Sequence, residues 1–304
     1  MNYELILIRY GELSLKSAYV RKQFESTLVR NIKNAFELNM LHCKITTDRG
    51  RIYVHTDEIS KGLDVLKRIF GITSFSPVLK TTSNIKDISD VAIDLSQKNL
   101  SKEKSFALRV TRTGEHDFTS QDVAVEIGSD IVKAAKASVN LTNPDFELFI
   151  EIRHDKTFLF TEKIRGTGGL PLGTQGKVLA LIDGLDSILA AWYIMRRGCD
   201  ILFVHSNEFN TDALHSFTTH WFIDSDITMI DLKSKNYYES LNKLSSEKKC
   251  DAIVTGYNFN VNYKDDLLKI KKLKKYVKLP VFLPLIAMDE EEIYKKRKEL
   301  GIVV

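Results

Sequence analysis

The sequence has few of the residues that mark secreted, membrane or metal-binding proteins. Only three of its 304 residues are cysteines, and none stands in a C-x-x-C pair. We therefore predict that Cys43, Cys199 and Cys250 are reduced, packed thiols and that no metal site is present. No apolar run reaches the roughly 18 residues of a transmembrane helix, and the N-terminus lacks a signal-peptide pattern. We expect a cytoplasmic protein without a membrane partner.

The charge balance does not by itself identify a partner. The chain has 44 Lys and Arg against 40 Asp and Glu, a net charge of +4. A mild positive excess permits nucleic-acid binding but does not require it. The length allows two or three domains with a sizeable core.

The first half of the chain mixes short strands and amphipathic helices in an α+β pattern. Strands are expected at 3–9, 43–47, 51–55, 76–82, 106–112, 146–153 and 156–164, and helices at 20–38, 59–72, 85–100 and 120–137. Gly71 is predicted to end the second helix as its C′ residue. Ser120 is predicted to be the N-cap of the fourth.

The second half alternates strictly between strands and helices. Strands are expected at 177–182, 200–205, 227–232, 251–256 and 280–285, with helices near 186–197, 210–221, 235–247, 260–275 and 289–300. This order predicts a doubly wound α/β domain whose sheet is mainly parallel, with ligands beyond the carboxyl ends of the strands. Glycine-rich residues 164–176 precede it and are typical of a linker.

A strand, a tight turn and a helix follow one another in KVLALIDGLDSILAAWYIMRRG, residues 177–198. Such a turn is typical of a phosphate-binding loop, where backbone N–H groups and the positive end of the helix hold an anion. An aspartate, Asp183, stands inside this turn. The loop therefore raises the question of whether it still binds a nucleotide.

Three stretches together carry one resemblance. IRYGELSLKSAYVRKQFESTLVRNI (8–32) resembles the ferredoxin-like domain of the tRNA 4-thiouridine synthetases, and LRVTRTGEHDFTSQDVAVEIGSDI (108–131) resembles their RNA-binding THUMP domain. RGTGGLPLGTQGKVLALIDGLDS (165–187) resembles their linker and pyrophosphatase-type nucleotide loop, the PP-loop. The resemblance implies a ferredoxin-like domain at 1–72, THUMP at 73–164, a linker at 165–176 and a truncated, HUP-like PP-loop domain at 177–304.

The resemblance also implies an RNA partner. Members of the family grip the acceptor end of tRNA through THUMP, adenylate uridine 8 with ATP, and replace the activated oxygen with sulfur. The candidate RNA-binding residues here are Lys16, Arg21, Arg109, Arg112, His116, Thr119, Ser120, Gln121 and Arg165. Arginine forks match phosphate geometry, and Thr119 and Ser120 stand at a predicted helix N-terminus where a phosphate could bind. Ordinary solvated surface is the alternative for the basic residues.

The nucleotide loop departs from the family pattern Ser-Gly-Gly-x-Asp-Ser. Ile182 takes the place of the leading serine and Asp183 that of the first glycine. The lost hydroxyl is worth about 0.5–1.5 kcal/mol, and an aspartate at positive φ would cost on the order of 1–2 kcal/mol. A carboxylate about 4 Å from a phosphate repels it by roughly 4 kcal/mol at an effective dielectric of 20. The alternative is that Asp183 ligates magnesium beside Asp186.

Two further departures concern the chemistry. In the family, the segment that matches DAIVTG (251–256) is followed by a glutamate and a Ser-Gln pair, but here it is followed by YNFNVNYKDD. The sequence also contains no counterpart of the segment that bears the catalytic cysteine, of a rhodanese domain, or of the CxxC pair of archaeal-type members. We therefore expect the chain to lack its own thiolate for sulfur transfer.

These observations favour a tRNA-binding pseudoenzyme that grips the acceptor end without thiolation, as a partner or competitor of an intact thiouridine synthetase and without a cofactor. The alternative is an active ATP-dependent tRNA uridine-8 sulfurtransferase, or an adenylating enzyme, that uses Mg²⁺–ATP and takes sulfur from a carrier protein. The nucleotide-binding candidates are Asp183, Gly184, Leu185, Asp186, Ser187 and Gly256, of which Asp186 and Ser187 are the catalytic candidates. An enzyme with a new small-molecule substrate is a third hypothesis.

A lysine-rich segment near the end of the chain allows two interpretations. Residues 264–278 contain seven lysines together with an apolar stripe. Such a pattern is typical of a solvated helix face, and it also suits a surface that contacts a nucleic-acid backbone.

Overall fold

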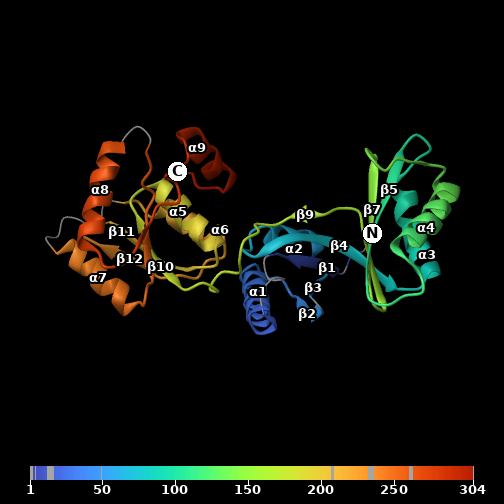
Figure 1. Cartoon of the computed structure of the whole chain (residues 1–304), viewed down its shortest axis with the longest axis horizontal. Coiled ribbons are helices and arrows are strands. Elements are labelled where there is room, and N and C mark those ends of the chain that lie inside the picture. The colour runs from blue at the N-terminus through green and yellow to red at the C-terminus, as the bar shows by residue number, and fades with distance from the viewer. Residues whose placement is uncertain are drawn as a thin grey trace. The chain divides into compact units, whose positions relative to one another are not determined.

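The computed structural model describes residues 3, 5–11, 17–48, 50–206, 209–231, 236–259 and 263–303. The chain forms two compact units (Figure 1). The first unit comprises Met1–Arg9, Met40–Val65 and Ser74–Arg165, and the second comprises Tyr10–Asn39, Leu66–Thr73 and Gly166–Val304. No helix in the described part of the chain combines the length and apolar character of a membrane span.

The first unit is built on a mixed sheet. Its strands are β1 (Leu5–Tyr10), β2 (Lys44–Asp48), β3 (Arg51–His55), β4 (Ile72–Thr82), β5 (Ser105–Thr113), β6 (Ser138–Val139), β7 (Phe146–Arg153), β8 (Lys156–Phe160) and β9 (Ile164–Arg165). Their order is β2-β3-β1-β4-β8-β7-β5-β6, with β9 paired to β4. The predicted hairpin of β7 and β8 is present as an antiparallel pair, whereas β5 and β7 are parallel. The predicted strand 156–164 is too long, because β8 ends at Phe160 and a separate two-residue strand, β9, begins at Ile164, whereas β6 was not predicted.

Two helices, α3 (Ile85–Asn99) and α4 (Ser120–Ala135), cover one face of strands β5 and β7 (Figure 1). The prediction that Ser120 is the N-cap of α4 is wrong, because Thr119 holds that position. Its Oγ1 accepts from the N–H of Asp122, and the Asp122 carboxylate accepts from the N–H of Thr119 at 2.8 Å. This reciprocal capping box supplies acceptors for two backbone N–H groups at the start of α4 that have no partner within the helix.

The second helix, α2 (Ile59–Leu66), is shorter than the predicted 59–72. The chain leaves the helix because Phe70 is buried against Trp192 and Trp221, with ring centroids 6.0 and 5.3 Å away. Gly71 is therefore not the C′ residue of this helix, although its φ is +98°. A Cβ at Gly71 would lie 2.9 Å from the backbone N of Pro171, so glycine is required there.

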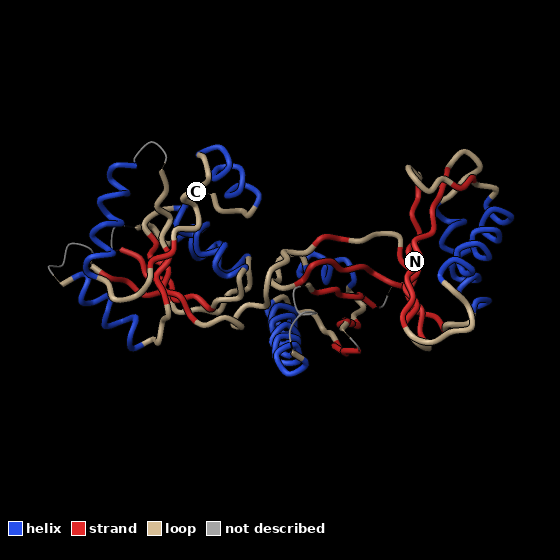
Figure 2. The backbone as a smooth tube through the Cα atoms, in the orientation of Figure 1, coloured by secondary structure: helices blue, strands red, loops and turns tan. Residues whose placement is uncertain are grey.

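The second unit contains a five-stranded parallel sheet, visible as the other group of strands in Figure 2. Its strands are β10 (Lys177–Ile182), β11 (Asp200–Ser206), β12 (Ile227–Ile230), β13 (Ala252–Val254) and β14 (Val281–Phe282). The order is β12-β11-β10-β13-β14, and every neighbouring pair is parallel. The order reverses between β10 and β13, which makes this the switch point where doubly wound sheets bind ligands. The predicted fold class is confirmed.

Helices cover both faces of this sheet (Figure 1). The helices of the second unit are α1 (Ala18–Leu38), α5 (Leu185–Arg196), α6 (Asp212–His220), α7 (Tyr237–Glu247), α8 (Tyr263–Tyr276) and α9 (Glu290–Glu299). Successive side chains of β10 point to opposite faces of the sheet, so one strand contributes to the helix layers on both faces. Val178 and Ala180 pack with α5, α6 and α9, whereas Leu179 and Leu181 pack with α7 and α8.

Glycine-rich residues 166–176 follow a course fixed by backbone hydrogen bonds. Gly166 and Gly168 donate to the carbonyls of Thr73 and Ile72 at 3.0 and 2.8 Å. The carbonyl of Gly198 accepts from three successive N–H groups, those of residues 173–175, at 2.8–3.0 Å. This segment is therefore bonded along much of its length to its own unit.

Candidate functional site

A pocket of about 900 Å³ lies at the carboxyl ends of β10 and β13, where the strand order reverses. It is lined by the predicted loop residues Asp183, Gly184, Leu185 and Asp186 and by Gly256. Acidic side chains predominate in its wall, which includes Asp265, Asp266, Glu290 and Glu291 with the two cations Lys269 and Arg297. Five of the six nucleotide candidates thus meet in one cavity.

Ser187, the sixth candidate, lies beneath the loop. Its side chain is buried, and Oγ accepts from the N–H groups of Asp183 and Gly184 at 3.1 and 3.2 Å. The same hydroxyl donates to the carbonyl of Gly184 at 2.6 Å. With all three contacts inside the turn, the hydroxyl fixes the shape of the loop at the start of α5.

Two glycines give this loop its open surface. Gly184 precedes α5 with an extended backbone, φ 179°, and a Cβ there would meet no atom within 4 Å. Gly256 follows β13, and a Cβ there would lie 2.3 Å from the backbone N of Ser187. Gly256 is therefore required by the close approach of two backbone segments, whereas Gly184 leaves room above the helix N-terminus for a ligand.

Asp186 is held at the wall of the pocket by residues from other elements. Its Oδ1 lies 3.1 Å from Nη1 of Arg297 on α9, and its Oδ2 accepts from Nδ2 of Asn258 at 3.4 Å. Loss of hydration raises the pKa of Asp186, while Arg297 and Asn258 oppose this rise. The carboxylate is thus oriented and partly neutralised before any ligand arrives.

Asp183 does not strain the loop. The cost considered for an aspartate at positive φ does not apply, because Asp183 is not among the positive-φ residues of the described chain. Its side chain is exposed to the pocket, yet the protein around it displaces much of the bulk water, and this loss of hydration raises the pKa of Asp183. The like charge of Asp266 adds to the rise, whereas Lys269 and a hydrogen bond with Tyr257 oppose it.

We expect Asp183→Asn to raise the thermal midpoint of unfolding at neutral pH. A carboxyl whose pKa is raised by folding binds its proton more tightly in the native state, so it destabilises that state once it ionises. The difference between variant and wild type is absent below the ordinary pKa of about 3.9, and it grows as pH rises from there to the raised pKa. Thermal unfolding followed between about pH 4 and pH 8 measures it.

Asp122→Asn supplies a control of opposite sign. Hydrogen bonds from Thr119 lower the pKa of Asp122, so its carboxylate stabilises the fold above the ordinary pKa and loses this effect as pH falls through the lowered value. This variant is expected to lower the thermal midpoint at neutral pH. Shifts of the same sign in both variants would contradict the assignment for Asp183.

The pocket is no preformed metal cage. Among the described residues, no three His, Cys, Asp or Glu side chains are grouped to hold an ion. Magnesium is commonly held by one or two carboxylates together with substrate phosphates. The carboxylates of Asp183 and Asp186 fit that limited role.

Several pocket residues were not predicted from the sequence. They are Tyr257, Asn258, Asp266, Lys269 and Arg297, supplied by the segment after β13, by α8 and by α9. Asn258 also binds the first turn of α8, because its N–H donates to Oδ2 of Asp266 at 3.1 Å. For Tyr257, Asn258, Asp266 and Lys269, the sequence indicated a role in the pocket only through their position after the carboxyl end of a central strand. No sequence pattern indicated that Arg297 would reach the pocket.

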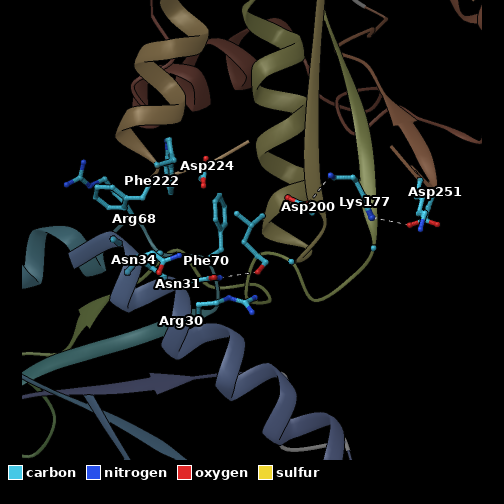
Figure 3. Close-up of a pocket in the computed structure, with 17 residues that line it drawn as sticks. Arg30, Asn31, Asn34, Arg68, Phe70, Lys177, Asp200, Phe222, Asp224 and Asp251 are labelled. Carbon is cyan, nitrogen blue, oxygen red and sulfur yellow. Dashed lines mark hydrogen bonds and ion pairs between the residues drawn. The ribbon is translucent and has the colours of Figure 1, made fainter. Parts of the chain in front are cut away.

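A second hollow, of about 580 Å³, lies at the amino ends of β10 and β11, the opposite edge of the sheet (Figure 3). Here Nζ of Lys177 lies 3.6 Å from Asp200, and the N–H of Lys177 donates to Asp251 at 3.0 Å (Figure 3). Basic Arg30 and Arg68 line the same hollow. Its mixed charges and its position distinguish it from the pocket at the nucleotide loop.

The predicted RNA-binding arginines of THUMP have partners within the protein. Nε of Arg109 donates to Glu147 at 2.7 Å, and the pair is about 40% exposed. Nη1 of Arg112 lies 3.2 Å from Nδ1 of His116, whose Nε2 donates to the carbonyl of His154 at 2.7 Å. Nδ1 of His116 is therefore the acceptor for Arg112. These contacts preorient both arginines at the edge of the THUMP sheet.

The remaining described RNA candidates lie on three different elements, α4, α1 and β9. Thr119, Ser120 and Gln121 lie at the start of α4, where the Asp122 carboxylate occupies the cap and disfavours a phosphate. Arg21 is exposed in the first turn of α1, and exposed Arg165 is part of β9. Lys16 lies outside the described residues. Their roles in RNA binding stay predictions.

Family models match nearly the whole chain. The ThiI ferredoxin-like domain matches residues 5–76, and the THUMP domain matches residues 82–162. The model described as thiamine biosynthesis protein (ThiI) matches residues 173–220 and 211–303. Their order agrees with the resemblance stated from the sequence.

Curated relatives agree with the family models. The probable tRNA sulfurtransferase of Methanobrevibacter smithii is 33% identical over 99% of this chain and 87% of that protein. The probable tRNA sulfurtransferase of Methanothermobacter thermautotrophicus is 34% identical over 99% of this chain and 85% of that protein.

Solved structures share the complete fold. PH1313 of Pyrococcus horikoshii Ot3 superposes with a TM-score of 0.83 at 27% identity, over 98% of this chain and 99% of that one. A 4-thiouridine synthetase in complex with RNA and ATP gives a TM-score of 0.80 at 27% identity, over 98% of this chain and 85% of that one. The chain therefore belongs to the ThiI family of tRNA sulfurtransferases, with ferredoxin-like, THUMP and PP-loop domains.

Proposed function

We propose that this protein is an ATP-dependent tRNA sulfurtransferase that makes 4-thiouridine. A uridine of bound tRNA attacks the α-phosphorus of ATP through its O4, pyrophosphate leaves, and sulfur then displaces AMP from the activated carbon. The observation that carries the proposal is the shared fold with a 4-thiouridine synthetase whose structure contains RNA and ATP. The alternative that the sequence raised is therefore preferred over a pseudoenzyme that only binds tRNA.

The geometry of the loop supports ATP binding. Ser187 fixes the turn from below, and Gly184 keeps the space over the N-terminus of α5 open. The N–H groups of Asp183 and Gly184 are used by Ser187, so the positive N-terminal end of α5 is what suits a phosphate group. We infer that the triphosphate lies over Gly184 and Leu185, with the adenosine toward the switch point between β10 and β13.

The case for a decayed loop is weaker than the sequence indicated. The expected strain at Asp183 does not arise, because its φ is not positive. Repulsion of phosphate by the Asp183 carboxylate is reduced by its hydrogen bond with Tyr257 and by nearby Lys269. Ile182 is fully buried in the core, so its side chain supplies no contact to the ligand and leaves phosphate binding to the backbone.

Magnesium enters this proposal with the nucleotide. Asp186 and Asp183 are the side chains that would hold the ion against the phosphates, and the ion would neutralise negative charge at the reacting phosphate. The predominance of carboxylates in the pocket wall suits a ligand that arrives as magnesium–ATP. We expect free phosphate without magnesium to bind weakly in this cavity, because the carboxylates repel it.

Sulfur is proposed to come from a separate donor. Burial raises the pKa of the Cys199 and Cys250 thiols, so both are mostly protonated at neutral pH and are poor nucleophiles. Neither cysteine lines the pocket at the nucleotide loop. Sulfide, delivered by a carrier protein or supplied in the assay, would form the new C–S bond as the C–O bond to AMP breaks.

The test is formation of 4-thiouridine in unmodified tRNA supplied with magnesium–ATP and sulfide, measured by mass spectrometry of the digested nucleosides. We expect tRNA-dependent release of pyrophosphate and a product that Asp186→Asn reduces by at least about tenfold, the effect of about 1.4 kcal/mol of lost stabilisation. Asp200→Asn, at the opposite edge of the sheet, is the matched control. A wild-type protein that binds tRNA but neither binds ATP nor releases pyrophosphate would favour the pseudoenzyme hypothesis instead.

A further inference from the structure

We propose that the outward face of α8 binds the phosphate backbone of the RNA substrate beside the ATP pocket. The face consists of Lys264, Lys271, Lys272 and Lys275, which we call the α8 lysine face. The inference rests on the proposed function, because it assigns a second contact surface for the same RNA. It lies in the PP-loop half of the chain, apart from THUMP.

Helical spacing places these four lysines together. At 100° per residue they occupy about 100° of the helix circumference, and all four are exposed. Ile270 and Leu273 point the opposite way and are buried in the core that α8 shares with β10. With a rise of about 1.5 Å per residue, the face extends about 16 Å along the helix.

The face carries positive charge that the fold does not neutralise. Within the described residues, none of these four lysines has a carboxylate within ion-pair distance, whereas Lys269 on the flank pairs with Asp266 at 3.6 Å. Lys271 and Lys275 stand four residues apart, and Lys272 and Lys275 three apart, so these pairs repel and destabilise the helix. The C-terminal dipole of α8 offsets this only for its last turn.

A neighbouring helix shows that such repulsion is not general in this protein. In α9, three glutamates occupy the first turn, and Lys296 pairs with Glu299 at 2.9 Å. Charge in α9 is therefore balanced within one helix. The unbalanced charge of α8 indicates an anionic partner.

The position of α8 relative to the pocket identifies this partner as the RNA substrate. Asp265, Asp266 and Lys269 in the first half of α8 line the pocket at the nucleotide loop. The acidic wall there repels a polyanion, so an RNA that delivers a uridine to ATP needs compensating charge close by. Lys264 directly precedes the pocket residue Asp265 in sequence, and Lys271, Lys272 and Lys275 follow in the second half of the same helix.

Other anionic partners fit the face less well. A helix that binds a lipid surface must insert a continuous apolar side, but Ile270 and Leu273 of α8 are buried in the core and the lysine face itself offers only one exposed leucine, Leu268. Lysine is also depleted in protein–protein interfaces. A nucleic-acid backbone, in contrast, binds exposed cationic side chains through its phosphates and needs no apolar contact.

The test uses the full chain with Lys264, Lys271, Lys272 and Lys275 all replaced by glutamine, which preserves helix propensity. The dissociation constant for tRNA is measured over a series of salt concentrations. We expect binding at about 0.15 M salt to weaken at least tenfold and the slope of log K against log salt to fall by about 2–4 units. ATP affinity is expected to stay within about twofold of wild type, since none of the four side chains lines the pocket.

A control variant removes the same charge elsewhere. Lys33, Lys61, Lys98 and Lys243, each in an i,i+3 or i,i+4 ion pair, are replaced by glutamine. We expect a slope change below one unit, because these lysines are already neutralised. Equal slopes for wild type and the α8 variant would refute the inference, as would equal losses in the two variants. Vesicles with about 30% phosphatidylglycerol test a lipid partner. The inference would also be refuted if wild type bound these vesicles and the α8 variant lost that binding while its tRNA binding stayed unchanged. Failure of the proposed function looks different, because wild type itself would then not use ATP.

Discussion

Replacing Gly256 by valine is expected to reduce ATP-dependent thiolation by about 10²-fold or more. A Cβ at this position would lie 2.3 Å from the backbone N of Ser187 and 2.6 Å from the backbone carbon of Asp186. These are backbone atoms at the start of α5, so no flexible side chain can move aside. The first turn of α5 must shift, and the hydroxyl of Ser187 then loses its contacts in the loop.

The measurement for Gly256→Val is tRNA-dependent pyrophosphate release together with calorimetric titration of ATP. Because Gly256 lies in the second unit, we expect tRNA binding by THUMP to be retained. Gly128→Ala is the glycine control, since its Cβ would meet only Leu108 at 3.8 Å and a helical alanine adds about 0.5–1 kcal/mol of stability. Normal ATP affinity in Gly256→Val would contradict the assigned position of the triphosphate.

Local sequence patterns predicted the scaffold of the site well. The apolar run Lys177–Ile182 is a strand with the predicted bounds, because its central position in a parallel sheet requires apolar residues on both faces. The loop and the start of α5 follow from the same pattern. The parallel order of the strands follows from strict alternation with helices.

Contacts between distant residues could not be predicted in this way. Arg297 reaches Asp186 across 111 positions of sequence, and Glu147 pairs with Arg109 from a neighbouring strand. A helical pattern extended through Phe70, but burial between two tryptophans outweighed local propensity there. The backbone angle at Asp183 was inferred from a glycine in related loops, and φ is not fixed by the identity of a residue in a relative.

Glu151 in the first unit allows a prediction of comparable size for stability. This carboxylate on β7 is 8% exposed and accepts from Nε and Nη2 of Arg9 at 3.2 and 3.1 Å and from Nε of Arg51 at 2.9 Å. Arg153, also 8% exposed, approaches at 3.4 Å. Desolvation lowers the pKa of Arg9, and Glu151 opposes that effect. One buried carboxylate therefore compensates several cations that join β1, β3 and β7.

We expect Glu151→Gln to lower the free energy of unfolding of the first unit by about 3–5 kcal/mol, because the neutral amide removes the carboxylate that pairs with the buried Arg9 guanidinium. Urea unfolding followed by far-UV circular dichroism measures the loss. Glu147→Gln is the matched control, since Glu147 lies on the same strand but forms a pair with Arg109 that is about 40% exposed. Screening by water limits the loss there to about 0–1 kcal/mol. Equal losses of unfolding free energy in Glu151→Gln and Glu147→Gln would contradict the view that burial makes the ion pairs of Glu151 more stabilising than the exposed pair of Glu147.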